Sequence, residues 1–367
     1  MRKLPIYFLI DVSESMVGEQ IQFVEDGMAT IIKAIKQDPH AIETVWVSII
    51  VFAGQAKTLV PLQEIVSFYP PKFPIGGGTS LGKGLGHLMY ELRKNTVKTT
   101  FEQKGDWKPI VFLFTDGVPT DDSKVAINEW KQNWAKTANL VAVSFGDETD
   151  TKLLSELTEN VLHFKNSTEE DYKKFFKWIT DSIKTSSVSV ERNASGFELA
   201  EMDGNTLSKI DLTKQPTPNL YVDNNYVVLS AKCQNTKRPY LMKYRKFIQP
   251  SGFAGLETRS YRLVGGFQID NSYFELSDDS QMNAKINSDE LVGAPSCPCC
   301  GNQFGFAMCQ CGKIHCIGQE EVSTCPWCGN QGTYGAGEGG FDVNRTLGYS
   351  VIYKRLYRKT FYRKEYY

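Results

Sequence analysis

Hydrophobic residues in the first half of the chain follow two alternating patterns. The segment from Ile6 to Ile10 is apolar throughout, which is typical of a central parallel strand covered on both faces. Apolar residues then recur at steps of three and four, at Ile21, Val24, Met28, Ile31 and Ile35. This spacing predicts one face of an amphipathic helix directly after the strand.

The same two patterns repeat as far as residue 186. They predict further strands over residues 44–53, 57–60, 110–114, 140–145 and 161–164. They predict helices from Ser80 into the low nineties and over residues 123–136, 153–157 and 169–183. Regular alternation of strands and helices predicts an α/β domain with a doubly wound, mainly parallel sheet, which binds ligands at the carboxyl ends of its strands.

The pattern changes after residue 186 and divides the rest of the chain into three parts. Hydroxyl-rich and proline-containing sequence predicts a linker over residues 187–225. Short apolar runs separated by turns, at 226–230, 240–247, 261–269 and 273–276, predict a small antiparallel β unit. We expect this unit and the cysteines that follow to form one β-rich, zinc-ribbon-like domain over residues 226–333. Residues 334–367 are a glycine-rich hinge and a basic, aromatic tail, for which we expect a role in protein contacts.

Composition narrows the class of protein. Of the 367 residues, 41% are hydrophobic and 23% are charged, as in a soluble globular protein, and the net charge is −1. Such a charge gives no overall attraction to nucleic acid or to an anionic membrane, and no apolar run approaches the 18 residues or so of a membrane span. Eight of the nine cysteines lie between Cys297 and Cys328, which favours a local metal cluster in a reducing compartment over a secreted disulfide framework. We therefore expect a cytoplasmic protein.

Oxygen-bearing side chains follow three of the predicted strands or lie in the loops beside them. Asp11, Ser13 and Ser15 come directly after the first strand, Thr79 follows a run of three glycines, and Asp116 follows the strand at 110–114. Alternate residues of an extended segment point the same way, so the first three would present their oxygens to one point. Oxygen donors select a hard cation, Mg²⁺ or Mn²⁺. The sequence predicts one such site at this edge of the sheet.

The cysteines predict a second kind of metal site. Two C-x-x-C-G segments begin at Cys297 and Cys325, a pattern that recurs in tetrahedral zinc sites. We predict zinc ligands at both segments and between them: Cys297, Cys300, Cys309, Cys311, His315, Cys316, Cys325 and Cys328. The two segments could face each other, with the middle group on a second ion, or the donors could pair in sequence order, so one or two Zn²⁺ ions are possible. We expect Cys299 to be an extra thiol and Cys233 to be a core residue.

The five oxygen donors resemble the metal-ion-dependent adhesion site of von Willebrand A domains, and the order of elements is similar to that fold over about half of the chain. The resemblance implies that an open coordination position on the metal takes a carboxylate from a partner protein. Ser13, Ser15 and Thr79 would be direct or near-direct ligands, whereas Asp11 and Asp116 could act directly or through water. Glu14 stands where many members of the family carry glycine, and we expect it to add negative charge at the rim of the site.

Both ends of the chain together resemble the TerY-type proteins of bacterial tellurite-resistance systems. The resemblance rests on the oxygen donors, the segment Gln37 to Val45 and the closing Cys-Pro-Trp-Cys-Gly. It implies a non-catalytic adaptor in a tellurite or related chemical-stress response, which assembles with a serine/threonine protein kinase and a PP2C-type phosphatase.

Two other classes of function remain open from the sequence. A nucleic-acid-binding zinc adaptor is possible because the tail is basic and aromatic, but Lys313 is the one basic residue between the first and last predicted zinc ligands. A metal-dependent hydrolase is less favoured, because the three oxygen-donor segments contain neither histidine nor cysteine and a thiolate-saturated zinc offers no open position. We therefore expect a binding protein and not an enzyme.

Overall fold

The structure is a computed structural model of the whole chain. It describes residues 2–116, 119–145, 151–164, 169–191, 199–201, 207–209, 226–250, 257–277, 285–335 and 340–344. The predicted role of the tail beyond residue 344 lies outside the described residues. The chain divides into two compact units, one made mainly of residues before 222 and the other mainly of residues from 222 onward.

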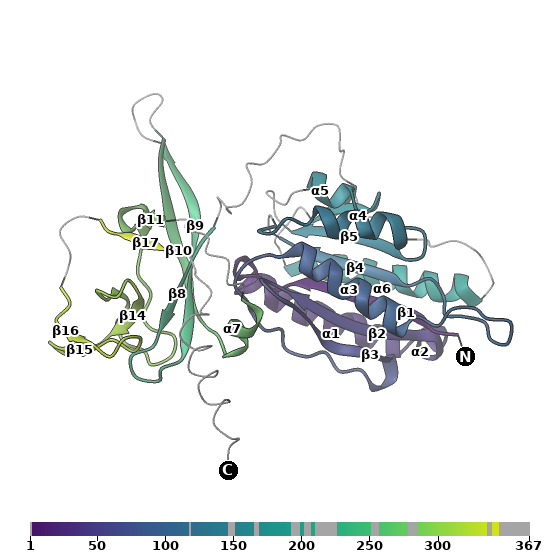
Figure 1. Cartoon of the computed structure of the whole chain (residues 1–367), viewed down its shortest axis with the longest axis horizontal. Coiled ribbons are helices and arrows are strands. Elements are labelled where there is room, and N and C mark those ends of the chain that lie inside the picture. The colour runs from purple at the N-terminus through teal and green to yellow at the C-terminus, as the bar shows by residue number, and fades with distance from the viewer. Residues whose placement is uncertain are drawn as a thin grey trace, which may run out of the picture. The chain divides into compact units, whose positions relative to one another are not determined.

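The first unit is built on a seven-stranded sheet in the order β3-β2-β1-β4-β5-β6-β7 (Figure 1). Its strands are β1 (Leu4–Asp11), β2 (Val45–Phe52), β3 (Ala56–Glu64), β4 (Ile110–Thr115), β5 (Asn139–Phe145), β6 (Val161–Phe164) and β7 (Leu207–Lys209). The strands from β2 to β6 in this order are parallel, and the two edge strands, β3 and β7, are antiparallel to their neighbours. The carboxyl ends of β1 and β4, where the oxygen donors were predicted, therefore lie side by side.

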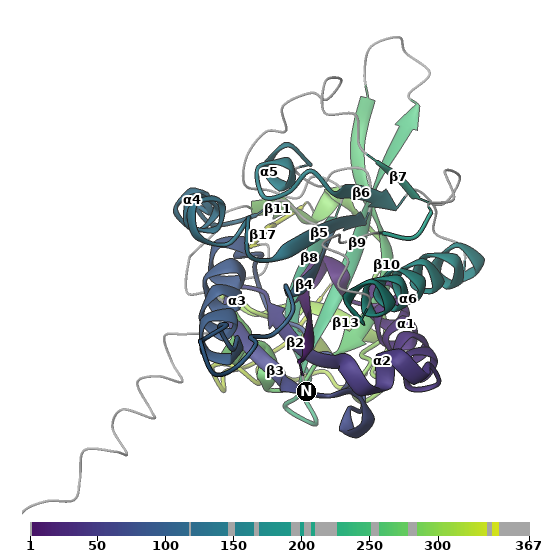
Figure 2. The ribbon, with the colours of Figure 1, turned by 90° about the vertical axis from the view of Figure 1, so that its right-hand side faces the viewer.

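Helices cover both faces of this sheet. They are α1 (Glu19–Lys36), α2 (Pro39–Thr44), α3 (Leu81–Asn95), α4 (Lys124–Asn133), α5 (Thr151–Ser155) and α6 (Glu169–Glu191), with short 3₁₀ turns at η1 (Glu14–Met16) and η2 (Ile65–Ser67). Figure 2 shows α1, α2 and α6 on one face and α3, α4 and α5 on the other. Side chains alternate across β1, so Tyr7 and Leu9 pack in the core beneath α3 while Phe8 stacks with Phe112 on the opposite face.

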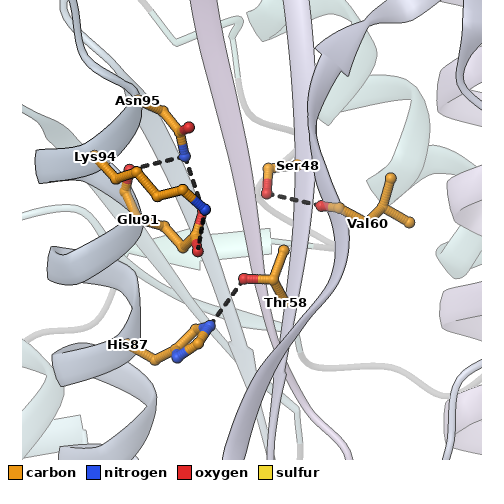
Figure 3. Close-up of polar contacts among 7 residues, drawn as sticks. All are labelled: Ser48, Thr58, Val60, His87, Glu91, Lys94 and Asn95. Atoms are coloured by element: carbon orange, nitrogen blue, oxygen red, sulfur yellow. Dashed lines mark hydrogen bonds and ion pairs between the residues drawn. The ribbon is translucent and has the colours of Figure 1, made fainter.

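Helix α3 is fixed to the β2–β3 hairpin by polar contacts as well as by its apolar face. The Nε2 atom of His87 lies 2.8 Å from the hydroxyl of Thr58 on β3 (Figure 3). Lys83 donates to the carbonyl of Gly54 at 2.7 Å. Burial lowers the pKa of His87. At the far end of the helix, the buried Glu91 carboxylate accepts from Asn95 at 2.8 Å. The contacts of His87 and Lys83 with the hairpin hold the helix that directly follows Thr79, whereas the bond between Glu91 and Asn95 lies within the helix.

Several segments of the first unit differ from prediction: β3 is longer than the predicted 57–60, α4 is shorter than the predicted 123–136, and α2 was not predicted. The last helix was predicted to end at Ile183 but continues to Glu191. In this extension the hydroxyls of Ser186 and Ser187 donate back to the carbonyls of Ser182 and Lys184, at 2.8 Å and 2.9 Å, so they do not interrupt the helix. Residues 207–209, predicted as linker, form β7 and pair with β6. The other linker residues, apart from 187–191 and 199–201, lie outside the described residues.

The second unit contains a six-stranded sheet in the order β12-β10-β9-β8-β14-β13. Its strands are β8 (Tyr226–Lys232), β9 (Pro239–Pro250), β10 (Glu257–Gln268), β12 (Leu291–Val292), β13 (Phe304–Met308) and β14 (Ile314–Ile317). Two small ladders join β11 (Lys285–Asn287) with β17 (Asp342–Asn344) and β15 (Ser323–Thr324) with β16 (Gln331–Gly332), and a 3₁₀ turn, η3 (Ser288–Glu290), follows β11.

One predicted strand of this unit is wrong. Residues 273–276 lie in a short helix, α7 (Ser272–Leu276). The carboxylate of Asp270 accepts a hydrogen bond from the backbone N–H of Ser272 at 2.8 Å, which starts a turn instead of an extended segment. A four-residue apolar run has too little periodicity to separate the two outcomes.

Among the described residues, none of the helices has the length and apolar character needed to cross a membrane.

Candidate metal centres

The first candidate site begins where β1 ends. Asp11 is the last residue of this strand and is fully buried, and its carboxylate accepts the backbone N–H of Ser13 at 2.9 Å. The chain then turns into η1, so the hydroxyls of Ser13 and Ser15 lie 3.0 Å apart. The predicted convergence of these three residues is therefore present in the structure.

The end of β4 completes this arrangement. Thr115, the last residue of β4, donates its hydroxyl to Asp11 at 2.7 Å, and Ser15 donates to the next residue, Asp116, at 2.7 Å. One continuous series of contacts thus links Asp11, Ser13, Ser15 and Asp116, which come from positions about a hundred residues apart. Parallel pairing of β1 with β4 produces this proximity, because it brings both carboxyl ends to one edge of the sheet.

Thr79 is held in place by a residue that the sequence analysis missed. The backbone N–H of Thr79 donates to the hydroxyl of Thr120 at 3.0 Å, and the N–H of Thr120 donates to the carbonyl of Thr79 at 2.8 Å. Thr120 lies only four residues after Asp116. This reciprocal pair connects the loop that carries Thr79 to the loop that carries Asp116. Its sequence signal, a hydroxyl in a turn, is too common to single out.

Asp121 was also missed, and it fixes the start of α3. Ser80 stands at the N-cap position of this helix but makes no side-chain cap. The carboxylate of Asp121 accepts the N–H of Gly82 at 3.0 Å instead, so the cap comes from a distant segment. Burial raises the pKa of Asp121, although the N–H groups of Lys83 and Gly82 act to lower it.

The electrostatics of the site fit a divalent cation. Burial raises the pKa of Asp11 to about 6, against the hydrogen bonds from Ser13 and Thr115, which favour the charged form. Among the described residues Asp11 forms no ion pair, and burying an uncompensated carboxylate is costly. A hard cation held by these carboxylate and hydroxyl oxygens would offset that cost. Glu14 was expected to add negative charge at the rim of the site, but it is only 8% exposed and is therefore buried.

The cysteines of the second unit gather into two groups of four. One group contains Cys233, Cys297, Cys300 and Cys316, and the other contains Cys309, Cys311, Cys325 and Cys328. Within each group the sulfur atoms lie within 4.8 Å of one another, and all nine cysteines are free thiols. The two C-x-x-C-G segments thus belong to different groups, as pairing in sequence order would also place them. The middle cysteines differ from that order, because Cys316 joins the first group while Cys309 and Cys311 join the second.

The sulfur separations have the size expected for a tetrahedral metal site. A zinc–sulfur bond of about 2.3 Å places two sulfurs of a tetrahedron about 3.8 Å apart. The distance is 3.8 Å between Cys300 and Cys316, 3.7 Å between Cys309 and Cys328, and 3.9 Å between Cys311 and Cys325. Four thiols at this spacing suit a thiophilic ion, and a bound cation would favour their deprotonation.

Cys233, predicted to be a core residue, takes part in the first group because its loop has the same geometry as the two C-x-x-C-G segments. In each loop the cysteine N–H donates to the carbonyl five residues later, at 2.8 Å for Cys233 and Cys297 and at 2.9 Å for Cys325. The residue four positions after the cysteine has a positive φ, which is 76° at Gly301, 79° at Gly329 and 59° at Lys237. The Cys233 loop lacks both the glycine and the second cysteine, so the sequence carries no zinc-site signature there.

His315 is the predicted zinc ligand that the structure does not place in either group. Side chains alternate along β14, so Cys316 joins the first group while its neighbour His315 points the other way. The buried His315 ring uses both nitrogens within the protein, with Nδ1 2.9 Å from the carbonyl of Cys316 and Nε2 2.8 Å from the hydroxyl of Tyr334. Cys233 therefore replaces His315 in the ligand set. Cys299 lies outside both groups, in line with its expected role as an extra thiol.

Each of the two units matches a known protein family. Residues 6–178 match the von Willebrand factor type A domain, in agreement with the doubly wound fold of the first unit. Residues 223–348 match the TerY-C metal binding domain. The chain therefore carries the two domains that the sequence resemblance to TerY-type proteins predicted, and it combines a von Willebrand A fold with a β-rich, metal-binding domain.

The solved structures that are similar to this chain have low sequence identity to it. Proximal thread matrix protein 1 from the mussel byssus is 20% identical, with 51% of this chain and 46% of that chain covered and a TM-score of 0.36. The ArnB paralog VWA2 from Sulfolobus acidocaldarius is 11% identical, covers 74% and 66%, and has a TM-score of 0.38. A von Willebrand factor type A protein from Catenulispora acidiphila is 13% identical, covers 75% and 68%, and has a TM-score of 0.38. This chain spans about half the length of the mussel protein. A search of curated proteins finds no match.

Proposed function

We propose that this protein is a non-catalytic scaffold that binds a partner protein through a divalent cation on its von Willebrand A domain. The observation that carries the proposal is the series of contacts from Asp11 to Asp116. The Asp11 carboxylate accepts the Ser13 N–H at 2.9 Å, the Ser13 and Ser15 hydroxyls lie 3.0 Å apart, and the Ser15 hydroxyl donates to Asp116 at 2.7 Å. Donors of this kind would hold Mg²⁺ or Mn²⁺ together with Thr79.

Each residue has a separate task in this proposal. The buried Asp11 orients the turn by accepting the Ser13 N–H, and Asp116 orients the Ser15 hydroxyl. The Thr79 loop is kept in register by Thr120. A bound cation would supply an open coordination position for a carboxylate oxygen of the partner. No group in the three donor segments is a histidine or cysteine, which is why we propose binding and not hydrolysis.

We propose that the second unit binds two Zn²⁺ ions, one in each group of four cysteines, and that both ions are structural. Four thiolates fill a tetrahedral coordination shell and leave no open position for a substrate. The free thiols also support our proposal of a cytoplasmic location, because a reducing compartment keeps such clusters available for metal.

We further propose that the scaffold acts in a bacterial tellurite or chemical-stress response together with a serine/threonine protein kinase and a PP2C-type phosphatase. This step rests on the TerY-type combination of domains. Purification of the tagged protein from its host, with and without added Mg²⁺, tests it. We expect a kinase and a phosphatase to be retained by the wild-type protein in Mg²⁺ and lost with Asp116→Ala, and retention of neither would contradict the assignment.

Calorimetric titration of the full chain with Mg²⁺ and Mn²⁺ tests the site itself. Asp116→Ala and Ser13→Ala should each weaken cation binding by about tenfold or more, because each removes an oxygen donor. Ser48→Ala is the matched control, since Ser48 is also a buried serine but bonds to the Val60 carbonyl within the β2–β3 hairpin (Figure 3). Equal affinities in the wild type and all three variants would show that the oxygen donors do not form the site.

A further inference from the structure

Positive charge is concentrated in one part of the second unit, although the whole chain is close to neutral. Between Tyr226 and Ile269 the sequence contains eight lysines and arginines and one acidic residue, Glu257, a local net charge of +7 in a chain of net charge −1. This segment forms β8, β9 and β10, and the β9–β10 hairpin extends beyond the shorter strands of its sheet (Figure 1). Such local charge gives the hairpin a field that attracts anions.

Strand register places two exposed charges of this segment together. Arg262 on β10 is directly opposite Arg245 on β9, and Arg245 is directly opposite Tyr226 on β8. Residues that face each other across antiparallel strands share one face of the sheet. The neighbouring residues Tyr244 and Tyr261 belong to the core on the other face, so the arginines stand on the face away from that core. Both arginines are exposed.

This pairing is unfavourable unless an anion joins it. Like charges directly opposite each other on neighbouring strands destabilise a sheet. Among the described residues, neither arginine forms an ion pair with a carboxylate, and the described side chains of β8, β9 and β10 include no acidic group. The guanidinium of Arg262 lies 4.4 Å from the centre of the Phe247 ring, a contact that restricts its orientation. A restricted guanidinium beside a second one forms a donor pair suited to a tetrahedral oxyanion.

We propose that Arg245 and Arg262 form a binding site for the phosphate of a phosphorylated side chain on a protein partner. Arginine pairs bind the dianion of a phosphomonoester through several charge-assisted hydrogen bonds. A single strand of nucleic acid fits less well. Base recognition on a sheet depends on open aromatic rings, whereas Phe247 has Arg262 over it and Tyr226 has Lys243 over it at 4.5 Å. The pair shares no residue with the oxygen-donor site or with either cysteine group, and the proposal does not depend on the proposed cation-dependent function.

Retention on immobilised peptides tests the proposal with the zinc-loaded full chain. The probes are a peptide library with a fixed central phosphoserine and the same library with serine, at about 0.15 M salt to screen weak surface attraction. We expect the wild-type protein to be retained about tenfold better on the phosphorylated library. Arg245→Gln/Arg262→Gln should remove this difference.

Two further variants separate a shaped site from simple charge. Lys33→Gln/Lys285→Gln removes two exposed positive charges outside this sheet face and should bind as the wild type does. Arg245→Lys/Arg262→Lys keeps the charge but loses the planar donors, so its preference for the phosphorylated library should fall several-fold. Zinc content and thermal unfolding confirm that each variant is folded.

Three outcomes would overturn the proposal. The first is equal retention of the wild type on both libraries, and the second is an undiminished preference for the phosphorylated library in Arg245→Gln/Arg262→Gln. The third is loss of that preference in the control Lys33→Gln/Lys285→Gln. An oligouridylate of about 12 nucleotides serves as the competitor that represents nucleic acid. If it binds through the arginine pair and the phosphorylated library does not, the occupant is a nucleic acid and the protein assignment is wrong.

Discussion

The two units use their candidate metal ligands in different ways. In the first unit a core of large apolar residues, including Leu9, Leu113 and Trp130, packs between the sheet and the helices without any metal ligand among its members. The oxygen donors stand at the ends of the strands that this core has already fixed. In the second unit Cys233, Cys297 and Cys316 are themselves members of the hydrophobic core. A bound metal would thus be peripheral to the fold of the first unit and central to that of the second.

This difference shows that a metal site does not by itself reveal what the metal does. A site attached to a complete core can leave a coordination position open for a partner, because stability does not depend on filling it. A site that replaces part of a small core must be closed, since its ligands supply the packing and the metal supplies the cohesion. The predictions below separate these two situations.

Removal of metal should have the largest effect and should act on one unit. A strong zinc chelator should unfold the second unit, because structural zinc sites contribute on the order of 10 kcal/mol to folding. The first unit should keep its own unfolding transition in calorimetry. If chelation left hydrogen-exchange protection of β8 and β14 unchanged, the cysteine groups would not be the cohesive element of that unit.

Substitution of single donors should distinguish Cys233 from His315 as a ligand. Cys233→Ser removes one of four sulfurs of the first group, so the zinc content should fall from two ions to about one per chain. His315→Phe keeps an aromatic ring beside Tyr334 and removes both nitrogens, and it should retain two ions. Elemental analysis of the purified variants measures their zinc content. Two ions in Cys233→Ser and one ion in His315→Phe would restore His315 to the ligand set in place of Cys233. Cys299→Ser serves as the control for loss of a thiol.

Overpacking the first unit should destabilise it without any loss of metal. Gly27 on α1 faces the ring of Phe176 on α6, and a Cβ at this position would lie 2.0 Å from a ring carbon. Gly27→Ala should therefore lower the free energy of unfolding of the first unit by about 1–3 kcal/mol. Thermal unfolding measures the change. Gly86→Ala on α3 is the control, because a Cβ there would meet nothing within 4 Å.

The smallest effect should come from the residue that positions Thr79. Thr120→Val removes the hydroxyl that accepts the Thr79 N–H, so Mg²⁺ affinity should fall about tenfold while zinc content stays the same. Thr120→Ser keeps the hydroxyl and should restore most of the affinity. Titration calorimetry compares the three proteins, and identical Mg²⁺ affinity in the valine variant would show that the Thr79–Thr120 pair has no part in the site.

Much of the first unit could be predicted from sequence because its signals are local. The apolar run of β1 and the helical spacing of apolar residues in α1 each lie within one element, and each predicts which residues of that element are buried. Asp11 and Asp116 follow such runs directly, so their place at one edge of the sheet follows from parallel strand order. The extent of α6 and the existence of β7 could not be read in this way, since polar helix ends and three-residue strands carry little periodicity.

The zinc module was harder to predict because its ligands are distributed by strand register. Sequence spacing identifies Cys297 and Cys325 as the starts of zinc-binding turns. It does not show that β14 pairs with β8, which brings Cys316 beside the loop of Cys233, more than 80 residues earlier in the chain. The alternation of β14 then excludes His315, because adjacent strand residues point to opposite faces.

The sequence by itself determined the two domains, the order of elements in the first, the oxygen donors and the two cysteine turns, because each is encoded within a short stretch of chain. Tertiary structure alone decided which cysteines share an ion, that Asp121 caps α3 in place of Ser80, and that Arg245 and Arg262 stand side by side. These arrangements depend on the register of strands and on loops that meet across long separations. Register is fixed by the packing of a whole face and not by the residues of any one segment.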